Sequence, residues 1–595
     1  MPKTIKSRQI HWLFLLIVIL GTSSSFALDS KKYITIDQID PSMDAYCLTV
    51  MQGTTIEKFD LKILSIVKNA IPGRDRILVV GTDPKFIHAG PIRGCSGSPV
   101  YIDGKMAGAL SSGWSFSKDP LYMVTPIEDM LEISNTPASR LDKAKQPAPV
   151  LALDFTKPLD LNEVRTLLDT TPANLASENT LLTVTSLPEH VCQTLKPSFE
   201  KIGLVPVAGA ATSSQSMDDI QLAPGSTLVI PLVTGDISMA VTGTVTEVDG
   251  NKVYGFGHPF LGYGQIDLPM ATGKIHTVVS TVSFSFKLAS AGKIVGAIRS
   301  DLGSGIYGEI GQNAPMIPIR IDVDRFDDPQ KHTFNCELAV NRFYTPQMSM
   351  ATIMGAAAIY GNLPPEHTVK YNANIETRQF GSIVFENISS GQGLSDLAGD
   401  AAGIISLLMN NPYQKVDVTR LDFNIEITPD NLMTKISNVI LSDSNVEPGQ
   451  TVDVKVILQP YMKPKTQHTF KLTIPRDLAD GEYEISVFGS YGYDKFLRKN
   501  ATQKYLQYDV PTLITAIKNI VKVRRDRLYI TLELPDDGII VKEKELPFIP
   551  ATKALLLGDP ARTLATKPHQ HWIEKSKNIE SIVTTTKTIK ITVEK

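Results

Sequence analysis

The chain has 595 residues, of which 42% are hydrophobic and 20% charged, and its formal net charge is −3. This composition is typical of globular proteins, and the length predicts roughly three to four domains. The charge is nearly balanced, and no basic stripe or run of Lys and Arg indicates nucleic-acid binding. Only four cysteines are present, Cys47, Cys95, Cys192 and Cys336. They are too few for a disulfide scaffold, and no Cys-x-x-Cys or His-x-x-x-His spacing indicates a zinc site.

The N-terminus has the features of a secretory signal peptide. Lys3, Lys6 and Arg8 precede an apolar run, Leu13–Leu20, and Ser25-Phe26-Ala27 places small residues at positions −3 and −1 of a cleavage site. The run is about half as long as the roughly 20 residues that a spanning helix needs. Cleavage is therefore favoured over a retained membrane anchor. The mature protein is expected to be exported to the periplasm, the cell surface or the medium.

Strand-like patterns dominate the mature chain, with helices expected at 348–360 and 393–409. Short alternating strands with turn signals from about residue 416 are typical of an immunoglobulin-like β-sandwich. A Pro-, Ala- and Lys-rich linker is expected at 136–149. The predicted divisions are 1–27, signal peptide; 28–142, a serine-bearing half domain; 143–224, a connecting region; 225–415, a histidine-bearing half with a helical extension; 416–500, the sandwich; and 501–595, a C-terminal β-rich region.

A cluster of small residues, Gly94-Cys95-Ser96-Gly97-Ser98-Pro99, stands directly before a predicted hairpin. The strands VYI and MAGAL of that hairpin are joined through Asp103-Gly104, a dipeptide typical of a type I′ turn. Glycines let the backbone bend sharply, so N–H groups can converge beside the Ser96 hydroxyl. Converging N–H groups beside a nucleophile form an oxyanion hole. The alternative is a Gly/Ser turn that only leads into a structural hairpin.

A serine nucleophile needs a base, and a second hairpin, GTVTEVDGNKVYGFGHPF, offers one. Its strands are joined through Asp249-Gly250, and His258 stands at the end of the second strand. Gly255 and Gly257 leave space around the imidazole. The sequence therefore favours His258 as the base. The alternative bases are His88 and His276.

The serine turn with its hairpin resembles the nucleophile segment of chymotrypsin-like proteases, and the two blocks together resemble the SpoIVB peptidase family. The resemblance covers about residues 44–314. It rests on AYCLTVMQGTTIEKFDLKILSIV, GCSGSPVYIDGKMAGAL, DPLYMVTPIEDML, GTVTEVDGNKVYGFGHPFLGYG and VGAIRSDLGSGIYGEIG. It implies a mainly β fold with a chymotrypsin-like double β-barrel and a few helices, ahead of the sandwich and the C-terminal mixed β region. In this chain the serine block comes first, so the halves look permuted.

The resemblance also implies roles for individual residues. Ser96 matches the nucleophile, His258 the base, Asp83 the third triad member and Ser111 an orienting residue, with Gly94 and Cys95 beside Ser96 in the oxyanion hole. The segment after His258 lacks the acidic residue that the sporulation protease of this family carries. Asp267 and Asp236 are therefore alternatives to Asp83.

Residue pattern and resemblance together predict an exported serine endopeptidase that acts on a protein or peptide substrate, without a metal or an organic cofactor. The sandwich is expected to be a binding or spacing module for an envelope-protein partner. One alternative is a non-catalytic cell-surface scaffold on a degenerate peptidase fold. Another is a protein that processes only itself, for which the linker at 136–149 is the expected cleavage site.

Two cysteines depart from the family pattern. Cys95 stands where Met is usual and Cys47 where Gly is usual. Two unusual cysteines in one half of an exported protein predict a disulfide between them, which would clamp the nucleophile turn. The alternative is a pair of independent buried thiols, which behave as small hydrophobic side chains.

Overall fold

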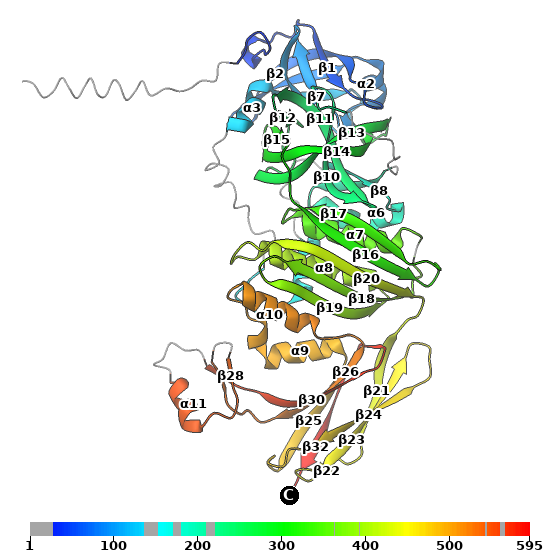
Figure 1. The fold of residues 1–595 in the computed structure, drawn as a ribbon, viewed down its shortest axis with the longest axis vertical. Helices are drawn as coiled ribbons and strands as arrows, with labels where there is room; N and C mark the ends of the chain where they lie inside the picture. Colours follow the sequence, from blue (N-terminus) through cyan, green and yellow to red (C-terminus); the bar gives the residue numbers. More distant parts are fainter. Residues whose placement is uncertain are drawn as a thin grey trace, which may run out of the picture.

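The computed structural model describes residues 28–135, 153–170, 180–209, 220–361, 363–391, 393–541, 544–559 and 566–595. The predicted signal peptide and the linker at 136–149 lie outside these ranges. Strands make up 48% and helices 20% of the structure, which confirms a mainly β protein. The described units follow one another along the long axis of the molecule (Figure 1). No helix in the described ranges combines the length and the apolar character needed to span a bilayer.

The first unit is a closed six-stranded β-barrel in the order β1-β2-β3-β7-β6-β5. Its strands are β1 (Ala45–Thr49), β2 (Glu57–Ile71), β3 (Arg74–Gly81), β5 (Pro99–Ile102), β6 (Lys105–Gly113) and β7 (Leu121–Pro126). Along β2, Phe59, Leu61 and Ile63 are buried and their neighbours exposed, because successive side chains of a strand point to opposite faces. The predicted Asp103-Gly104 hairpin is confirmed: both turn residues have positive φ, as a type I′ turn requires.

The second unit is also a six-stranded barrel. The pairings run from β10 through β13, β14, β15, β12 and β11 and return to β10, which closes the ring. Its strands are β10 (Thr227–Gly235), β11 (Ser238–Asp249), β12 (Lys252–Gly255), β13 (Gly264–Val279), β14 (Ser285–Leu302) and β15 (Gly305–Ile310). The predicted chymotrypsin-like double barrel is therefore present, with the serine-bearing barrel first.

The two barrels meet along a short strand and a small shared core. β4 (Ile92–Arg93) leaves the first barrel and pairs in parallel with β14 of the second. Met106 and Met130, from the first unit, pack in one cluster with Tyr254 and Tyr307 from the second. The remaining short elements of the first unit are α2 (Pro84–Ala89), α3 (Ile127–Leu131), and the 3-10 helices η1 (Ile36–Gln38) and η2 (Glu132–Asn135). The segment that follows β4 is the predicted nucleophile turn, so the turn lies at the barrel junction.

A large sheet continues from the second barrel into the middle of the molecule (Figure 1). Its strands there are β16 (Met316–Arg325), β17 (His332–Ala339), β18 (Thr368–Thr377), β19 (Gly381–Ser390) and β20 (Val418–Thr428), with β8 (Thr180–Thr185) and β9 (Leu204–Ala208) beyond β11. The helices α5 (Leu161–Thr170), α6 (Glu189–Lys201), α7 (Tyr344–Ala358) and α8 (Gly393–Asn410) accompany it. α7 and α8 are almost entirely buried and confirm the helices expected at 348–360 and 393–409.

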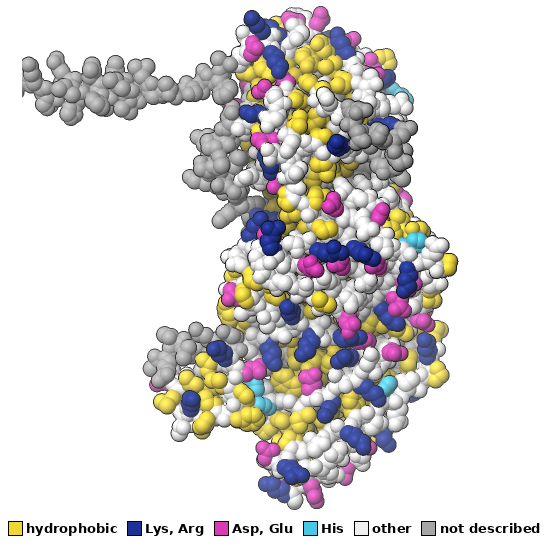
Figure 2. Space-filling view, in the orientation of Figure 1, with side chains coloured by type: hydrophobic (Ala, Val, Ile, Leu, Met, Phe, Trp, Pro, Cys, Tyr) yellow, Lys and Arg dark blue, Asp and Glu magenta, His cyan; other side chains and the backbone are white. Residues whose placement is uncertain are grey.

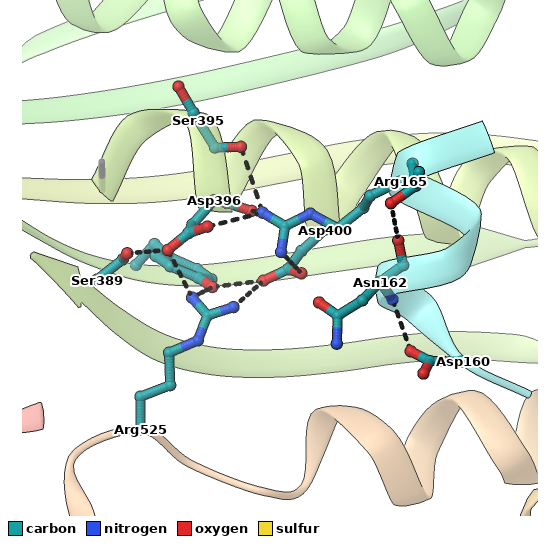
Figure 3. A network of polar contacts seen from close by, with 10 residues as sticks. Asp160, Asn162, Arg165, Ser389, Ser395, Asp396, Asp400 and Arg525 are labelled. Carbon is teal, nitrogen blue, oxygen red and sulfur yellow. Dashed lines mark hydrogen bonds and ion pairs between the residues drawn. The ribbon is translucent and has the colours of Figure 1, made fainter. Parts of the chain in front are cut away.

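An ionic network anchors α8 to the neighbouring elements (Figure 3). Arg165 of α5 lies 2.9 Å from Asp396, and Arg525, in the loop before β26 (Arg527–Leu534), lies 3.2 Å from Asp400. Tyr371 donates a hydrogen bond to Asp400 at 2.8 Å. Burial alone would raise the pKa of Asp396, but Arg525 and Arg165 lower it overall. The charges of two carboxylates and two guanidinium groups thus balance at the contact between the middle sheet and the C-terminal part.

The C-terminal part is a sandwich of two sheets, ordered β24-β23-β21-β31 and β22-β32-β25-β26-β30, around one hydrophobic core. Their bounds are β21 (Met433–Leu441), β22 (Asn445–Val446), β23 (Thr451–Pro460), β24 (Thr466–Thr473), β25 (Gly481–Phe488), β30 (His571–Asn578), β31 (Ile582–Val583) and β32 (Thr586–Val593). β25 pairs with both β26 and β32, so strands from the predicted 416–500 and 501–595 segments form one unit. β20 belongs to the middle sheet because it pairs in parallel with β16.

A small lobe projects from the sandwich around α11 (Ala551–Leu557) (Figure 1). Hydrophobic side chains cover part of its surface (Figure 2), and Phe548, Leu555 and Leu556 are strongly exposed. The remaining elements of this region are β27 (Ile539–Val541), β28 (Lys544–Leu546), β29 (Thr566–Pro568), α9 (Ser490–Asn500), η3 (Thr502–Tyr505) and α10 (Val510–Val521). The lobe therefore leaves apolar surface in contact with solvent.

Candidate active site

Ser96 lies in a tight turn that rests on strand β6 of the first barrel. The Ser98 N–H donates to the Cys95 carbonyl at 2.9 Å and closes the turn. The Gly97 N–H donates to the Leu110 carbonyl at 2.7 Å. Gly97 has φ +92°, and a Cβ on it would lie 2.0 Å from the Thr244 carbonyl oxygen. Only glycine permits this close approach between the serine turn and the second barrel.

Strand β11 of the second barrel fixes the turn from the other side. The Thr244 N–H donates to the Ser96 carbonyl at 2.8 Å, and its hydroxyl donates to the Gly94 carbonyl at 2.9 Å. The Thr246 hydroxyl donates to the Gly97 carbonyl at 2.8 Å. Residues two apart on a strand face the same side, so both threonines reach the turn. These positioning threonines were not predicted, although their alternation in GTVTEV was visible in the sequence.

His258 follows β12 in a turn that is held against the first barrel. Phe256 and Gly257 both have positive φ, +69° and +68°, which reverses the chain just before the histidine. A positive φ is unusual for a bulky residue such as Phe256. The Thr125 hydroxyl donates to the Gly257 carbonyl at 2.5 Å. The first barrel thus holds the histidine turn, as the second barrel holds the serine turn.

Ser96 and His258 line the same cavity at the barrel junction, with a volume of about 310 Å³. Its aromatic lining side chains, besides His258, are Trp114, Tyr122, Phe256 and Phe284. The Ser96 hydroxyl donates to the Ser111 carbonyl at 3.1 Å, and His258 Nδ1 lies 2.8 Å from the Pro259 carbonyl oxygen. A carbonyl only accepts, so this contact places the proton on Nδ1 and leaves the lone pair on Nε2. Burial lowers the pKa of His258, which favours the neutral imidazole that a base requires.

Some backbone N–H groups around Ser96 already donate hydrogen bonds to protein carbonyls, and others do not. The Cys95 N–H donates to the Ile92 carbonyl at 3.2 Å. Within the described ranges, the Ser96 N–H donates to no protein acceptor. It is therefore an amide of this turn that is available to a developing oxyanion. Ser111, predicted as an orienting residue, contacts the Ser96 hydroxyl through its carbonyl, while its own hydroxyl donates to Met123 at 3.0 Å.

Residues 22–131 match the family model described as SpoIVB peptidase S55. This segment belongs to the SpoIVB peptidase family. It contains the whole first barrel and the Ser96 turn, so the assignment supports a serine peptidase. His258 and the second barrel lie beyond the matched residues. No curated protein and no solved structure shows significant similarity to the chain.

The predicted third triad member, Asp83, lies in the SpoIVB peptidase segment but does not line the cavity. It is the N-cap of α2, where its carboxylate accepts the Lys85 N–H at 2.8 Å. The alternatives are engaged elsewhere: Asp267 pairs with Arg299 at 2.6 Å, and Asp236 accepts the Asn335 N–H at 2.7 Å. Among the described residues, the hydrogen-bond partner of His258 Nδ1 is the Pro259 carbonyl and not a carboxylate.

The alternative histidines stand away from the serine. His88 is exposed on α2, and His276 contacts the Ser290 hydroxyl at 2.7 Å from β13. Neither lines the cavity that contains Ser96. Of the candidate bases, only His258 lines the cavity that contains Ser96.

A buried carboxylate that was not predicted as functional fixes the segment after His258. Asp301, on β14, accepts the N–H groups of Phe260, Leu261 and Gly262 at 2.7, 2.6 and 2.8 Å. Burial raises its pKa to about 6, although these hydrogen bonds oppose the shift. Asp301 thus orders the chain that continues from the histidine turn. Its place in the RSDLGSG stretch gave no local signal for this role.

The predicted disulfide between Cys47 and Cys95 is not formed in the SpoIVB peptidase segment. Both residues are buried free thiols in the core of the first barrel. The Cys95 thiol lies within hydrogen-bonding reach of the Thr49 hydroxyl and the Lys287 ammonium. Burial raises the pKa of both thiols. In the structure the two cysteines therefore correspond to the alternative, buried thiols that are not bonded to each other.

Proposed function

We propose that the protein is an exported serine endopeptidase whose active site is built between two β-barrels. The observation that carries the proposal is the shared cavity, which is lined by Ser96 from the SpoIVB peptidase segment and His258 from the second barrel. Export rests on the predicted signal peptide at 1–27. The envelope-protein partner and the choice of substrate stay predictions.

In the proposed reaction, Ser96 Oγ turns from the Ser111 carbonyl toward His258 Nε2. The hydroxyl attacks the scissile carbonyl while Nε2 takes its proton. The Ser96 N–H donates to the oxyanion that forms, because no acceptor among the described residues engages it. Nε2 then returns the proton to the leaving amine, and water releases the acyl group by the same steps. The Pro259 carbonyl holds Nδ1–H throughout, which keeps the proton-accepting lone pair on Nε2.

Covalent labelling tests this proposal. The mature chain, beginning after residue 27, is incubated with a fluorophosphonate probe, and the modified residue is mapped by peptide mass spectrometry. We expect the label on Ser96, no label in Ser96→Ala, and strongly slowed labelling in His258→Ala. Ser115→Ala removes another hydroxyl of the same cavity and serves as the matched control with unchanged labelling. Wild-type protein that stays unlabelled, or a label that persists in Ser96→Ala, would overturn the proposal.

A further inference from the structure

A buried lysine lies directly beneath the nucleophile turn. Lys287 is on β14, which pairs with β4 so that Ser285 and Phe286 stand opposite Ile92 and Arg93. The next residue along each strand places Lys287 beside Gly94. A Cβ on Gly94 would lie 3.1 Å from Lys287 Cβ and 3.2 Å from its Cδ, so the lysine stem packs against the glycine. Lys287 is only 1% exposed, which makes it an interior group.

The ammonium of Lys287 fixes the direction of a hydrogen-bond chain that reaches the turn. Nζ donates to Thr244 Oγ1 at 3.3 Å, and this hydroxyl donates onward to the Gly94 carbonyl at 2.9 Å. In its protonated form Lys287 Nζ has no lone pair to accept a hydrogen bond, so the Thr244 proton points away from it, toward Gly94. The same threonine holds the Ser96 carbonyl through its N–H. Lys287 therefore sets the orientation of the residue that contacts both Gly94 and Ser96.

A second branch of the same chain reaches the far end of the turn. Lys287 Nζ donates to Thr49 Oγ1 at 2.6 Å, and the Ser98 hydroxyl donates to that same oxygen at 2.9 Å. Thr49 lies on β1 of the first barrel, whereas Thr244 lies on β11 of the second. One ammonium thus joins both barrels and both ends of the Gly94–Ser98 turn.

Lys287 forms no ion pair with a carboxylate in the described part of the chain, and it donates hydrogen bonds to two threonine hydroxyls. The titratable groups that face it are the thiols of Cys95, in the turn, and Cys47, on β1. Burial lowers the pKa of Lys287, and the thiols oppose that shift. A methionine would fill the same space without the cost of burying a charge. Beside a nucleophile turn, however, a buried positive charge would stabilise the oxyanion that develops during the reaction, because little water is present to screen it.

We propose that Lys287 is a positioning residue of the peptidase, which orders the nucleophile turn through Thr244 and Thr49 and places positive potential behind the Ser96 amide. This inference rests on the proposed serine peptidase function. It makes the protonated lysine necessary for the chemical step and not for substrate binding. The expected result of its loss is a lower kcat with an almost unchanged KM.

The test measures kcat, KM and the pH dependence of kcat for wild type, Lys287→Met and Thr244→Val on a cleaved peptide. Lys287→Met should lower kcat at least about tenfold, and Thr244→Val should lower it in the same direction. Wild type should lose kcat at alkaline pH as the lysine deprotonates. Lys287→Met should show no such alkaline loss. Lys293→Met, which changes an exposed lysine of the same strand, is the matched control with wild-type kcat.

Melting temperatures of all variants are measured in parallel. If Lys287→Met does not fold, the role of Lys287 is tested by the kcat of Thr244→Val and by the loss of wild-type kcat at alkaline pH. Wild-type kcat in both variants, or a wild-type profile without an alkaline loss, would overturn the role of Lys287. Cleavage that continues in Ser96→Ala would instead overturn the peptidase proposal itself, so the two failures are distinguishable.

Discussion

At the scale of single residues, the site depends on groups that the sequence pattern identified and on others that only the fold reveals. Ser96 and His258 stand in recognisable Gly-rich frames, and the structure places both on one cavity. Asp83 was assigned by resemblance, yet the dipeptide Asp83-Pro84 is itself the pattern of an N-cap followed by proline at the first helical position. The structure shows that local role. Asp301 and Lys287 act through tertiary contacts and carry no local sequence signal.

The pH dependence of peptide cleavage tests His258 as the base. Burial lowers its pKa below the ordinary value of 6.5, so the imidazole stays neutral until the pH falls below that value. We expect kcat/KM to fall on the acidic side with a midpoint below 6.5, and His258→Ala to lose almost all activity while His88→Ala keeps it. A midpoint above 7, or the reverse ranking of the two variants, would assign the base to another group.

Substitution of Gly97 tests the close approach of the two barrels. In Gly97→Ala the added Cβ would meet the Thr244 carbonyl oxygen at 2.0 Å, in addition to the strain of φ +92°. Gly104→Ala is the matched control, because its φ is +76° but nothing lies within 4 Å of the new Cβ. The control should lose only about 1–2 kcal/mol of stability and keep its labelling by fluorophosphonate. Gly97→Ala should lose labelling, and equal behaviour of the two variants would contradict this packing.

At the scale of elements, each barrel holds the catalytic candidate of the other. Thr244 and Thr246 of β11 fix the serine turn, and Thr125 of β7 fixes the histidine turn. The hairpins that frame these turns were predictable because Asp-Gly turns and alternating strands are local patterns. The contacts between the two barrels could not be predicted from local patterns, since they join residues more than a hundred positions apart.

The carboxylate of Asp301 gives the histidine segment a measurable pH signature. Its pKa is raised from 3.8 to about 6 in the folded protein. The folded state therefore binds this proton more tightly than the unfolded state, and the stability gained from protonation is fully present below pH 3.8. It is lost as the pH rises through about 6. In denaturant titrations between pH 4 and pH 7, Asp301→Asn should lack this decline. An identical pH dependence in wild type and variant would contradict the assignment.

At the scale of the whole molecule, the sequence predicted the mainly β architecture and the order of its parts better than their boundaries. β20 has the alternation expected of a sandwich strand, but it pairs with β16 of the middle sheet. The sandwich instead recruits strands from both sides of residue 500. Alternation shows which face of a strand is buried but not which strand pairs with it, so such boundaries are set by long-range packing.

The ionic network in Figure 3 should stabilise the middle of the molecule without taking part in catalysis. Asp400→Ala removes the carboxylate that accepts hydrogen bonds from Arg525 and Tyr371 and leaves Arg525 with its 3.6 Å contact to Asp396. We expect a loss of about 3–5 kcal/mol. Asp417→Ala, which removes a surface pair with Lys415, should cost less than about 1 kcal/mol. Chemical denaturation measures both. Fluorophosphonate labelling of folded Asp400→Ala should match wild type. Slower labelling of fully folded Asp400→Ala would show that the ionic network affects the active site.

Ser96 and His258, which come from two different barrels and line one cavity, form the proposed peptidase site. Its most direct test is the digestion of a proteome-derived peptide library by the purified mature chain, with new peptide termini identified by mass spectrometry. Wild type should generate a reproducible set of cleavages. Ser96→Ala should reduce cleavage by roughly 10⁴-fold or more at an unchanged melting temperature, and His258→Ala should do so as well. Wild-type cleavage by folded Ser96→Ala would contradict the account.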